Sequence, residues 1–477
     1  MVNEYRMLIG GELCEGKFMR EIRSPFSGEV VCRVPVADEA DIEKAVNSAV
    51  SGFEKMKNIP SYLRAELLIR LRDEIKKRKE DFARSIALEA GKPVTDSRGE
   101  VDRACITLTL GSEEAKRIGG ELIPLDLLPV NIGKFAITRR FPLGPILGIT
   151  PFNFPLNLGM HKVAPALAAG NSIIWKPASQ TPGTAFLFGE IFHEVCRDLD
   201  IPCSALNVIS TPPEIAEKIA RDDRIKMLTF TGSPAIGWKL KKLSGEKKVT
   251  LELGGNAGVI IGADADIDYA VNRCIHGGFS FAGQICISVQ RIFIEKPVYE
   301  EFSTRLSAGV EKLKPGDPLD ENTRIGPVIS AGDAERIEQW INEAVKDNAK
   351  ILTGGTRKGT LVTPTVLSDV KPDMKICRNE VFGPLVTVTP FENWEDAIAM
   401  VNDSIYGLQA GIFTRDIKRI FKAFNSIEVG GLIVNDIPTF RSDNMPYGGV
   451  KGSGMGREGL KYAIEEMTEP RLMVINT

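Results

Sequence analysis

A single cysteine stands in the part of the sequence best suited to nucleophilic chemistry. Cys286 lies in the run 277–288, where glycines and small side chains surround the thiol. Such residues let the backbone or a ring of another molecule approach closely, and a cysteine held there as its thiolate would be a nucleophile. Because a lone cysteine is more often a small buried hydrophobic residue, this interpretation depends on partners elsewhere in the chain.

Two polar residues could supply those partners. Glu252 ends the otherwise apolar run 249–253, and a carboxyl at the rim of an apolar cleft would have a raised pKa, which suits a general base. The alternative is a glutamate that faces solvent at the end of a strand. Asn153 stands between two aromatic residues and two prolines in the run 150–155. Its amide could donate to an oxyanion, or it could bond its own backbone in a turn.

The elements that must position these residues alternate between short apolar runs and helical periodicity. This alternation is typical of βαβ units and predicts an α/β fold with parallel, doubly wound sheets. The first third reads as polar and helical, 121–140 as extended chain, and a second α/β domain begins near residue 254. The predicted helices are 38–57, 61–90, 156–169, 266–281, 298–313 and 394–401, with one more from 182, and the predicted strands are 145–150, 172–176, 206–209, 227–230, 249–253, 258–261, 290–294, 384–389, 411–414 and 431–434.

Ligands of such folds bind at the carboxyl ends of the strands, often between domains. We therefore expect the chemistry near residues 150–180, 230–255 and 280–290.

Length, charge and cysteine use narrow the function classes. A chain of 477 residues predicts two or three domains, and its net charge of −3 gives no electrostatic reason to expect a nucleic acid partner. We expect neither a secretion signal nor a membrane-spanning helix, because the apolar runs are too short. Eight scattered cysteines predict free thiols in a cytoplasmic protein. Three histidines without i, i+4 spacing argue against a metal centre.

These segments together resemble the aldehyde dehydrogenase superfamily of the non-acylating, NAD(P)-dependent type. The family's motifs occur here in the family's order over about residues 140–460. The most similar types of member are lactaldehyde, non-phosphorylating glyceraldehyde-3-phosphate and succinate-semialdehyde dehydrogenases. The matching runs are Pro-Phe-Asn-Phe-Pro at 151–155, Lys-Pro-Ala at 176–178, Phe-Thr-Gly-Ser at 230–233, Glu-Leu-Gly-Gly-Asn at 252–256, Gly-Gln-Ile-Cys at 283–286, Glu-Val-Phe-Gly-Pro at 380–384 and the C-terminal run 446–458.

The resemblance implies a role for each matching residue. Cys286 would attack an aldehyde and form a thioester, Asn153 and the Cys286 backbone N–H would hold the oxyanion, and Glu252 would activate the hydrolytic water. Ser233, at the start of a helix, would place backbone N–H groups against the cofactor pyrophosphate. Glu380 and Lys176 would contact the two riboses and Phe382 the nicotinamide. The cofactor-binding set that the resemblance implies is Thr150, Pro151, Lys176, Ser179, Gly232, Ser233, Gly254, Glu380 and Phe382.

The family's organisation would also carry over. It implies a Rossmann-like cofactor domain at 1–120 and 142–253, an α/β catalytic domain at 254–445, and a small β element for oligomerisation at 121–141 and 460–477. A homodimer or homotetramer is the expected assembly.

One departure from the family pattern concerns the cofactor. Many NAD-preferring members have a glutamate directly after Lys-Pro-Ala, and Ser179 stands there instead. Without the carboxylate, a 2′-phosphate is no longer repelled. We expect NADP, alone or beside NAD; the alternative is a neutral exchange that leaves NAD preferred.

Two arginines suggest the substrate. Arg441 lies in a loop that resembles the substrate-anchoring loop of members acting on short polar or anionic aldehydes. Arg103 matches an arginine of phosphate-recognising members, but those also tend to have arginine where Ile285 stands here. We expect a small hydroxylated or singly anionic, lactaldehyde-like aldehyde. The alternative is that both arginines are surface or salt-bridged residues.

Two other functions stay open. A CoA-acylating aldehyde dehydrogenase shares the cysteine but commonly lacks the glutamate found here at 252. A catalytically silent binding relative would have lost Cys286, Asn153 or Glu252, and all three are present.

Overall fold

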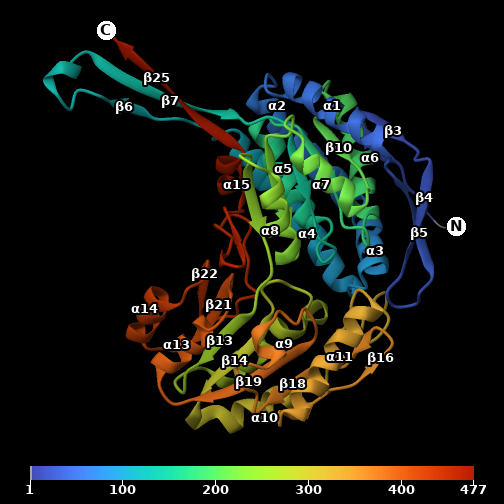
Figure 1. Ribbon diagram of the computed structural model, residues 1–477, viewed down its shortest axis with the longest axis vertical. Helices are drawn as coiled ribbons and strands as arrows, with labels where there is room; N and C mark the ends of the chain where they lie inside the picture. The colour runs from blue at the N-terminus through green and yellow to red at the C-terminus, as the bar shows by residue number, and fades with distance from the viewer. Residues whose placement is uncertain (1–2) are drawn as a thin grey trace.

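Two large twisted sheets, one in each half of the molecule, organise the fold (Figure 1). The computed structural model describes residues 3–477. The first sheet has eight strands in the order β24-β12-β11-β8-β9-β10-β2-β3, and its five central strands are parallel. These strands are β2 (Met7–Ile9), β3 (Glu12–Cys14), β8 (Ile146–Ile149), β9 (Ile173–Lys176), β10 (Leu206–Val208), β11 (Met227–Thr231), β12 (Lys248–Glu252) and β24 (Gly454–Met455).

Helices cover both faces of this sheet, which is why its short strands are continuous apolar runs. Every residue of α5 is buried, and that helix ends at Gly170, whose φ of +88° is the left-handed conformation that glycine adopts readily. α4 packs against α2 and α5. The helices of this half are α1 (Glu39–Met56), α2 (Ser61–Lys77), α3 (Lys79–Ala90), α4 (Val94–Ala115), α5 (Asn157–Ala169), α6 (Gly183–Asp198), α7 (Pro213–Arg221), α8 (Pro234–Leu243) and α15 (Leu460–Glu466).

The second sheet has seven strands in the order β15-β18-β19-β14-β13-β21-β22, all parallel except the edge strand β15. Its strands are β13 (Ala257–Ile261), β14 (Val289–Glu295), β15 (Lys350–Thr353), β18 (Thr365–Ser368), β19 (Leu385–Phe391), β21 (Gln409–Phe413) and β22 (Gly431–Val434). Its helices are α9 (Ile267–Phe279), α10 (Tyr299–Val310), α11 (Ala331–Lys346), α12 (Lys375–Arg378), α13 (Trp394–Asn402) and α14 (Ile417–Ser426). The predicted α/β fold with parallel sheets is confirmed.

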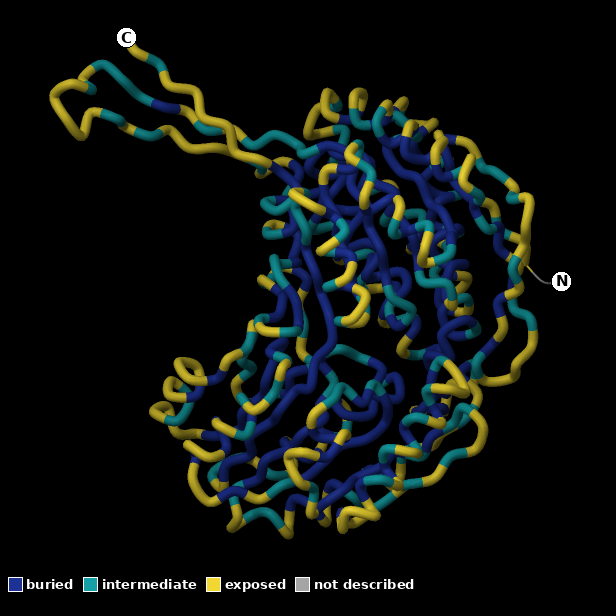
Figure 2. Tube along the Cα trace, viewed as in Figure 1, coloured by how far each residue is buried: buried dark blue, intermediate teal, exposed yellow. Residues whose placement is uncertain are grey.

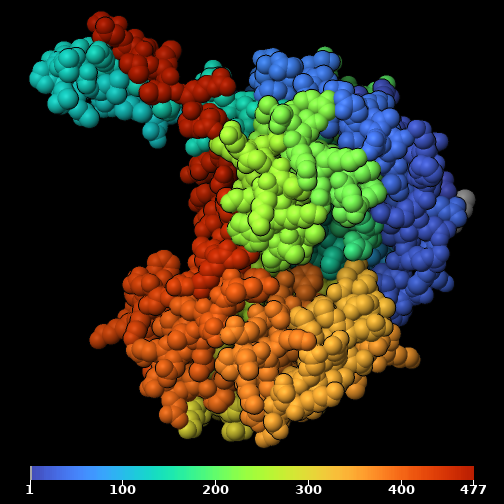
Figure 3. All heavy atoms as spheres, in the orientation of Figure 1, coloured from blue at the N-terminus to red at the C-terminus, as the bar shows by residue number. Residues whose placement is uncertain are grey.

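A three-stranded arm projects from the first half (Figures 1 and 3). It consists of β6 (Leu122–Pro124), β7 (Lys134–Pro142) and β25 (Thr468–Asn476), and most of its residues are exposed (Figure 2). The preceding helix α15 packs against α4 and α5 instead of joining the arm. Small sheets complete the fold: β1 (Asn3–Glu4), β4 (Phe18–Arg23) and β5 (Val30–Val36) form one, β16 (Arg357–Lys358) and β17 (Leu361–Val362) a second, and β20 (Tyr406–Gly407) and β23 (Val450–Lys451) a third.

Two expectations about the first third were wrong. Residues before α1 form the strands β1–β5 instead of helix, because the three-residue hairpin strands are too short to show a period, and β2 is held by pairing with β10. The single helix expected over 61–90 is two helices that meet at Arg78, whose φ of −101° and ψ of 26° are not helical.

Across residues 3–477 every helix is too short or too polar to span a bilayer. The eight cysteines all lie in this range and are free thiols, as expected.

Candidate active site

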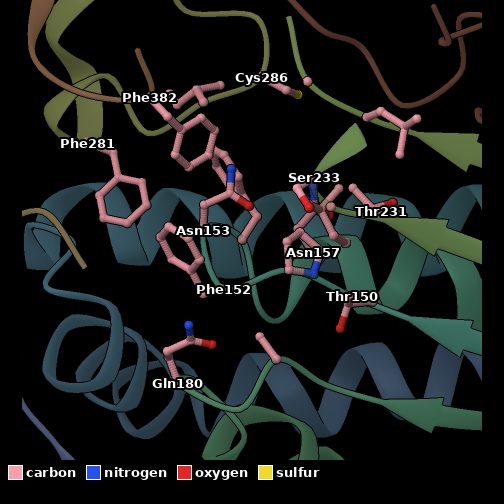
Figure 4. Close-up of a pocket in the computed structure, with 18 of the residues that line it drawn as sticks. Thr150, Phe152, Asn153, Asn157, Gln180, Thr231, Ser233, Phe281, Cys286 and Phe382 are labelled. Atoms are coloured by element: carbon pink, nitrogen blue, oxygen red, sulfur yellow. The ribbon is translucent and has the colours of Figure 1, made fainter. Parts of the chain in front are cut away.

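A cavity of about 1010 Å³ lies where the two halves of the molecule meet. Its walls combine carboxyl ends of first-sheet strands with loops of the second half (Figure 4). A cavity of this size is large enough for an extended cofactor beside a small substrate. Thirteen of the fourteen predicted site residues line it, and Glu252 does not: Arg103, Thr150, Pro151, Asn153, Lys176, Ser179, Gly232, Ser233, Gly254, Cys286, Glu380, Phe382 and Arg441.

The backbone that leads to Cys286 is strained. Phe281, Ala282 and Gly283 follow α9 in the left-handed region, with φ of 48°, 53° and 69°. Non-glycine residues in this region cost about 1–3 kcal/mol each, and such strain concentrates at functional sites. The turn ends helical structure and directs the next residues into the cavity.

The Cys286 thiol contacts the hydroxyl of Tyr447 at 3.1 Å. Burial raises the pKa of Cys286 to about 12, and the carboxyls of Glu380 and Glu252 add to that effect, whereas the hydrogen bond with Tyr447 opposes it. The free protein therefore holds Cys286 as a thiol at neutral pH. A nucleophilic role requires a proton acceptor nearby.

The Asn153 side chain is held beside Cys286 by a contact with a residue 131 positions later in the chain. Its Nδ2 donates to the backbone carbonyl of Gln284 at 2.8 Å, and the side chain is buried. Gln284 is itself fixed, since its Oε1 accepts from the N–H of Ile329 at 2.8 Å. The alternative in which Asn153 bonds its own turn is wrong. One amide hydrogen of Asn153 is left for a ligand near Cys286.

Glu252 ends β12 and is only 3 % exposed, so the alternative of a solvent-facing glutamate is wrong. Neither carboxyl oxygen has a hydrogen-bond partner. Burial, and then the negative charge of Glu458, raise the pKa of Glu252 well above its usual value, as predicted. The carboxyl packs near Gly448, where a Cβ would come within 2.8 Å of its Oε1.

A buried cluster of charges surrounds the other side of Tyr447. The guanidinium of Arg441 lies 3.7 Å from the Tyr447 ring centroid, and its Nη2 donates to Glu458 at 2.9 Å. Lys162, which is fully buried, donates to the second oxygen of Glu458 at 3.1 Å. Despite burial, the positive charges of Lys162 and Arg441 lower the pKa of Glu458 to about 2. The two buried carboxyls therefore differ: Glu458 is ionised at neutral pH, whereas the pKa of Glu252 is shifted towards its protonated form.

Arg103 joins the same cluster from α4. Its guanidinium donates to Asp443 at 2.8 Å, and Asp443 also lies 2.9 Å from His161 Nε2. Burial and the charge of Arg441 lower the pKa of His161. Both arginines are thus salt-bridged, as one sequence alternative held, yet they also line the cavity, and the buried Nε of Arg441 has no hydrogen-bond partner.

The other part of the cavity has features that fit a dinucleotide. Ser233 is the N-cap of α8 and its side chain makes no capping hydrogen bond, so N–H groups of the first turn stay open for an anion. Lys176 is 7 % exposed and its ammonium makes no hydrogen bond within the described residues. Glu380 accepts from the N–H of Gly255 at 2.9 Å, and a Cβ on Gly254 would come within 2.4 Å of Glu380 Oε2, so this approach requires glycine.

Aromatic rings separate the two parts of the cavity. Phe382 packs edge-to-face on Phe152 with centroids 5.8 Å apart. Figure 4 shows Asn153 near these rings, with Cys286 on the upper side of the cavity and Thr150 and Gln180 on the lower side. A flat ring of a ligand could be held between the aromatic wall and the thiol.

The Aldehyde dehydrogenase family model matches residues 15–473. The chain belongs to this family.

Curated relatives and solved structures match this chain over nearly its whole length. The chain is 45% identical over 476 residues to a 3-sulfolactaldehyde dehydrogenase of Priestia aryabhattai, covering 100% of this chain and 98% of the relative. Among solved structures, aldehyde dehydrogenase 21 of Physcomitrella patens, in complex with the reaction product succinate, has a TM-score of 0.98 at 41% identity and covers 100% of this chain and 99% of its own. Glyceraldehyde-3-phosphate dehydrogenase GapN of Methanocaldococcus jannaschii, complexed with NADP, has a TM-score of 0.93 at 37% identity, covering 96% and 99%.

The protein is therefore an aldehyde dehydrogenase by family. Its solved relatives hold either cofactor: GapN holds NADP, and a betaine aldehyde dehydrogenase of Staphylococcus aureus holds NAD+. The resemblance inferred from the motifs is confirmed. Sequence reasoning assigned no role to four residues of this aldehyde dehydrogenase that the structure places around the thiol and its charge cluster: Tyr447, Glu458, Lys162 and His161. Tyr447 and Glu458 lie within the matched C-terminal run, and that was the only signal. Lys162 and His161 occupy an apolar helix where buried polar residues were the available clue.

Proposed function

We propose that this aldehyde dehydrogenase oxidises a small hydroxylated aldehyde with an anionic group to its carboxylate, through a thioester on Cys286. One observation supports this most strongly. Tyr447 contacts the Cys286 thiol with its hydroxyl and the Arg441 guanidinium with its ring. The Tyr447 side chain thus contacts both the nucleophile and a positive charge. A short anionic aldehyde would reach from one to the other.

The chain's own residues account for each proton. Cys286 Sγ adds to the carbonyl carbon, and its proton passes to Glu252 directly or through water once that carboxyl is ionised. Asn153 Nδ2 and the Cys286 backbone N–H stabilise the oxyanion. The nicotinamide cofactor, when bound, supplies the acceptor for the hydride that leaves this carbon. Glu252 releases the thiol's proton to solvent and then takes a proton from the water that attacks the thioester. The carbon–sulfur bond breaks, and the acid product gives its remaining proton to the Cys286 thiolate, so that carboxylate and thiol result.

Glu252 also bears on the competing reaction. It is buried near Cys286 and has a raised pKa, which suits the activation of water. This favours hydrolysis over transfer of the acyl group to CoA, and retention of all three catalytic residues disfavours a silent binding role.

Two kinds of observation support an anionic substrate: the arginines on the cavity wall and the names of two relatives. Arg441 offers a buried Nε that makes no hydrogen bond within the described residues and lies 3.9 Å from Asp443, and Arg103 lies on the same cavity wall. A relative is named for 3-sulfolactaldehyde, and another was solved with succinate. A sulfonate or carboxylate on the substrate would pair with these arginines.

For the cofactor, we propose NADP as the preferred form. Ser179 puts no carboxylate at the adenosine ribose, and the buried ammonium of Lys176 lies on the same wall. Thr150, Pro151, Gly232, Ser233, Gly254, Glu380 and Phe382 would line the rest of the dinucleotide path, with the first sheet as the cofactor domain and the second as the catalytic domain.

The arm is proposed to bind a second copy of the chain. Its exposed apolar side chains would otherwise stay in water, and a dimer or tetramer would cover them. They include Leu122, Leu127, Val130, Leu472, Met473 and Val474.

The test is a panel of hydroxylated aldehydes with and without a sulfonate, carboxylate or phosphate group, assayed with NAD and NADP. Cys286→Ser should form no NAD(P)H. Glu252→Gln should form about one equivalent of NAD(P)H per site, more slowly than the unmodified protein, and then stop, because the amide accepts a proton neither from the thiol nor from the hydrolytic water. Cys14→Ser, away from the cavity, is the matched control and should behave as the unmodified protein. Normal turnover by Cys286→Ser, or full turnover by Glu252→Gln, would refute the mechanism.

A further inference from the structure

An arginine from the N-terminal strands lies behind the cofactor end of the cavity, in contact with Ser179, which lines it. Arg20 lies in β4, and its Nη2 donates to the backbone carbonyl of Ser179 and to the hydroxyl of Ser210, each at 3.0 Å. Ser179 and Ser210 follow the neighbouring strands β9 and β10. These two contacts fix the guanidinium beside Ser179, the residue that follows the Lys-Pro-Ala run.

Arg20 and Lys176 form a pair of positive charges without a counterion. Burial and the charge of Arg20 lower the pKa of Lys176 to about 8. Among residues 3–477 no carboxylate contributes to the pKa shift of either side chain. The buried Nε of Arg20 also has no hydrogen-bond partner. Glu217 lines the cavity as well, but Lys239 pairs with it at 2.5 Å.

Two neighbouring cations at a cavity wall are costly unless an anion joins them. A phosphate monoester has a charge of about −1.5 to −2 at neutral pH and several acceptor oxygens. The arginine fork matches such a group better than an ammonium alone. The serines at 179 and 210 add hydroxyls and no negative charge.

We propose that Arg20 and Lys176 together bind the 2′-phosphate of NADP, with Arg20 supplying the second positive charge. This inference rests on the proposed function and deepens its cofactor preference. Arg20 is separated from Ser179 by 159 residues and from Ser210 by 190, so no local motif contains it.

The experiment is calorimetric titration of the aldehyde-free protein with 2′,5′-ADP and with 5′-AMP. The unmodified protein should bind 2′,5′-ADP at least about tenfold more tightly, which corresponds to ~1.4 kcal/mol. Arg20→Gln should lose about tenfold for 2′,5′-ADP and less than about twofold for 5′-AMP. Arg20→Lys should retain part of the difference, because it keeps the charge. Arg23→Gln is the matched control, since it removes one exposed positive charge from the same strand, and it should change neither affinity.

Three results would overturn the inference. Equal losses for both ligands in Arg20→Gln would mean that Arg20 only shapes the loop after β9. Unchanged binding of 2′,5′-ADP would mean that Arg20 is not a phosphate ligand. Equal binding of both ligands by the unmodified protein would mean that this wall has no 2′-phosphate site.

The titration uses no aldehyde, so its outcome is independent of the proposed reaction. A protein that discriminates the two nucleotides but oxidises no aldehyde of the panel would refute the proposed substrate and leave the phosphate site intact. A protein that oxidises the aldehydes with NAD alone and fails to discriminate would do the reverse.

Discussion

Replacing Tyr447 by phenylalanine isolates one hydrogen bond to the nucleophile. The Tyr447 hydroxyl lies 3.1 Å from Cys286 Sγ and lowers a thiol pKa that burial otherwise raises, to about 12 overall. Phenylalanine keeps the ring that stacks on Arg441. A hydrogen bond to a charged group contributes about 1.5–3 kcal/mol. The thiolate fraction of Cys286 at a given pH below its pKa should therefore fall roughly 10- to 100-fold.

Residue-resolved alkylation measures this fraction. The free protein is labelled with iodoacetamide between about pH 7 and 10, and the labelled peptides are quantified by mass spectrometry. Labelling of Cys286 should rise about tenfold per pH unit without a plateau, because its pKa lies above this range. In Tyr447→Phe the same line should lie roughly 10- to 100-fold lower.

Cys203 is an internal reference in the same sample. Its contact with Cys196 lowers its pKa to about 7, so its labelling should level off above that pH and be equal in both proteins. A plateau for Cys286 near pH 8, or a change of less than about twofold in Tyr447→Phe while Cys203 behaves as stated, would refute the proposed contact.

Two further predictions concern Glu89 and Glu100, buried carboxyls that take no direct part in the proposed reaction. Burial raises the pKa of Glu89 from 4.5 to about 8. The folded chain therefore holds a proton that the unfolded chain loses, and stability falls as pH rises from about 4.5 to 8. Glu89→Gln should flatten this fall by up to roughly 5 kcal/mol, seen as a smaller loss of apparent unfolding temperature with pH; identical pH profiles would contradict it. Glu100→Gln leaves the ammonium of Lys92, 2.5 Å away and 1 % exposed, without its counterion and should cost about 3–5 kcal/mol of stability. The exposed Glu113→Gln on the same helix is the control, and equal denaturant midpoints for the two variants would contradict the prediction.

Glu100→Gln should also reduce activity, because Glu100 holds the turn that carries Asn153. Its Oε1 accepts from the N–H groups of Leu156 and Asn157 at 2.9 and 3.2 Å, and this fixes the turn that follows Asn153. Lys92 lies 3.7 Å from the ring centroid of Phe154 in the same turn.

The strands and helices predicted best were those with a strong local signal. The runs 172–176 and 227–230 are buried on both faces, so their apolar composition alone identifies β9 and β11. No helix was predicted over α11 or α14, although both have one apolar face. β2 and β3 were missed because three residues show no period and only pairing with β10 holds them.

Residue types and motif order were enough to predict the family, the α/β class and the candidate residues Cys286, Asn153 and Glu252, because these are local properties of the chain. What surrounds those residues follows only from the folded arrangement. The Tyr447 contact, the charge of Glu458 that raises the pKa of Glu252, and the approach of Arg20 to Ser179 join positions more than 150 residues apart. Their pKa values depend on burial and on charges a few ångströms away, and both arise only when the chain folds.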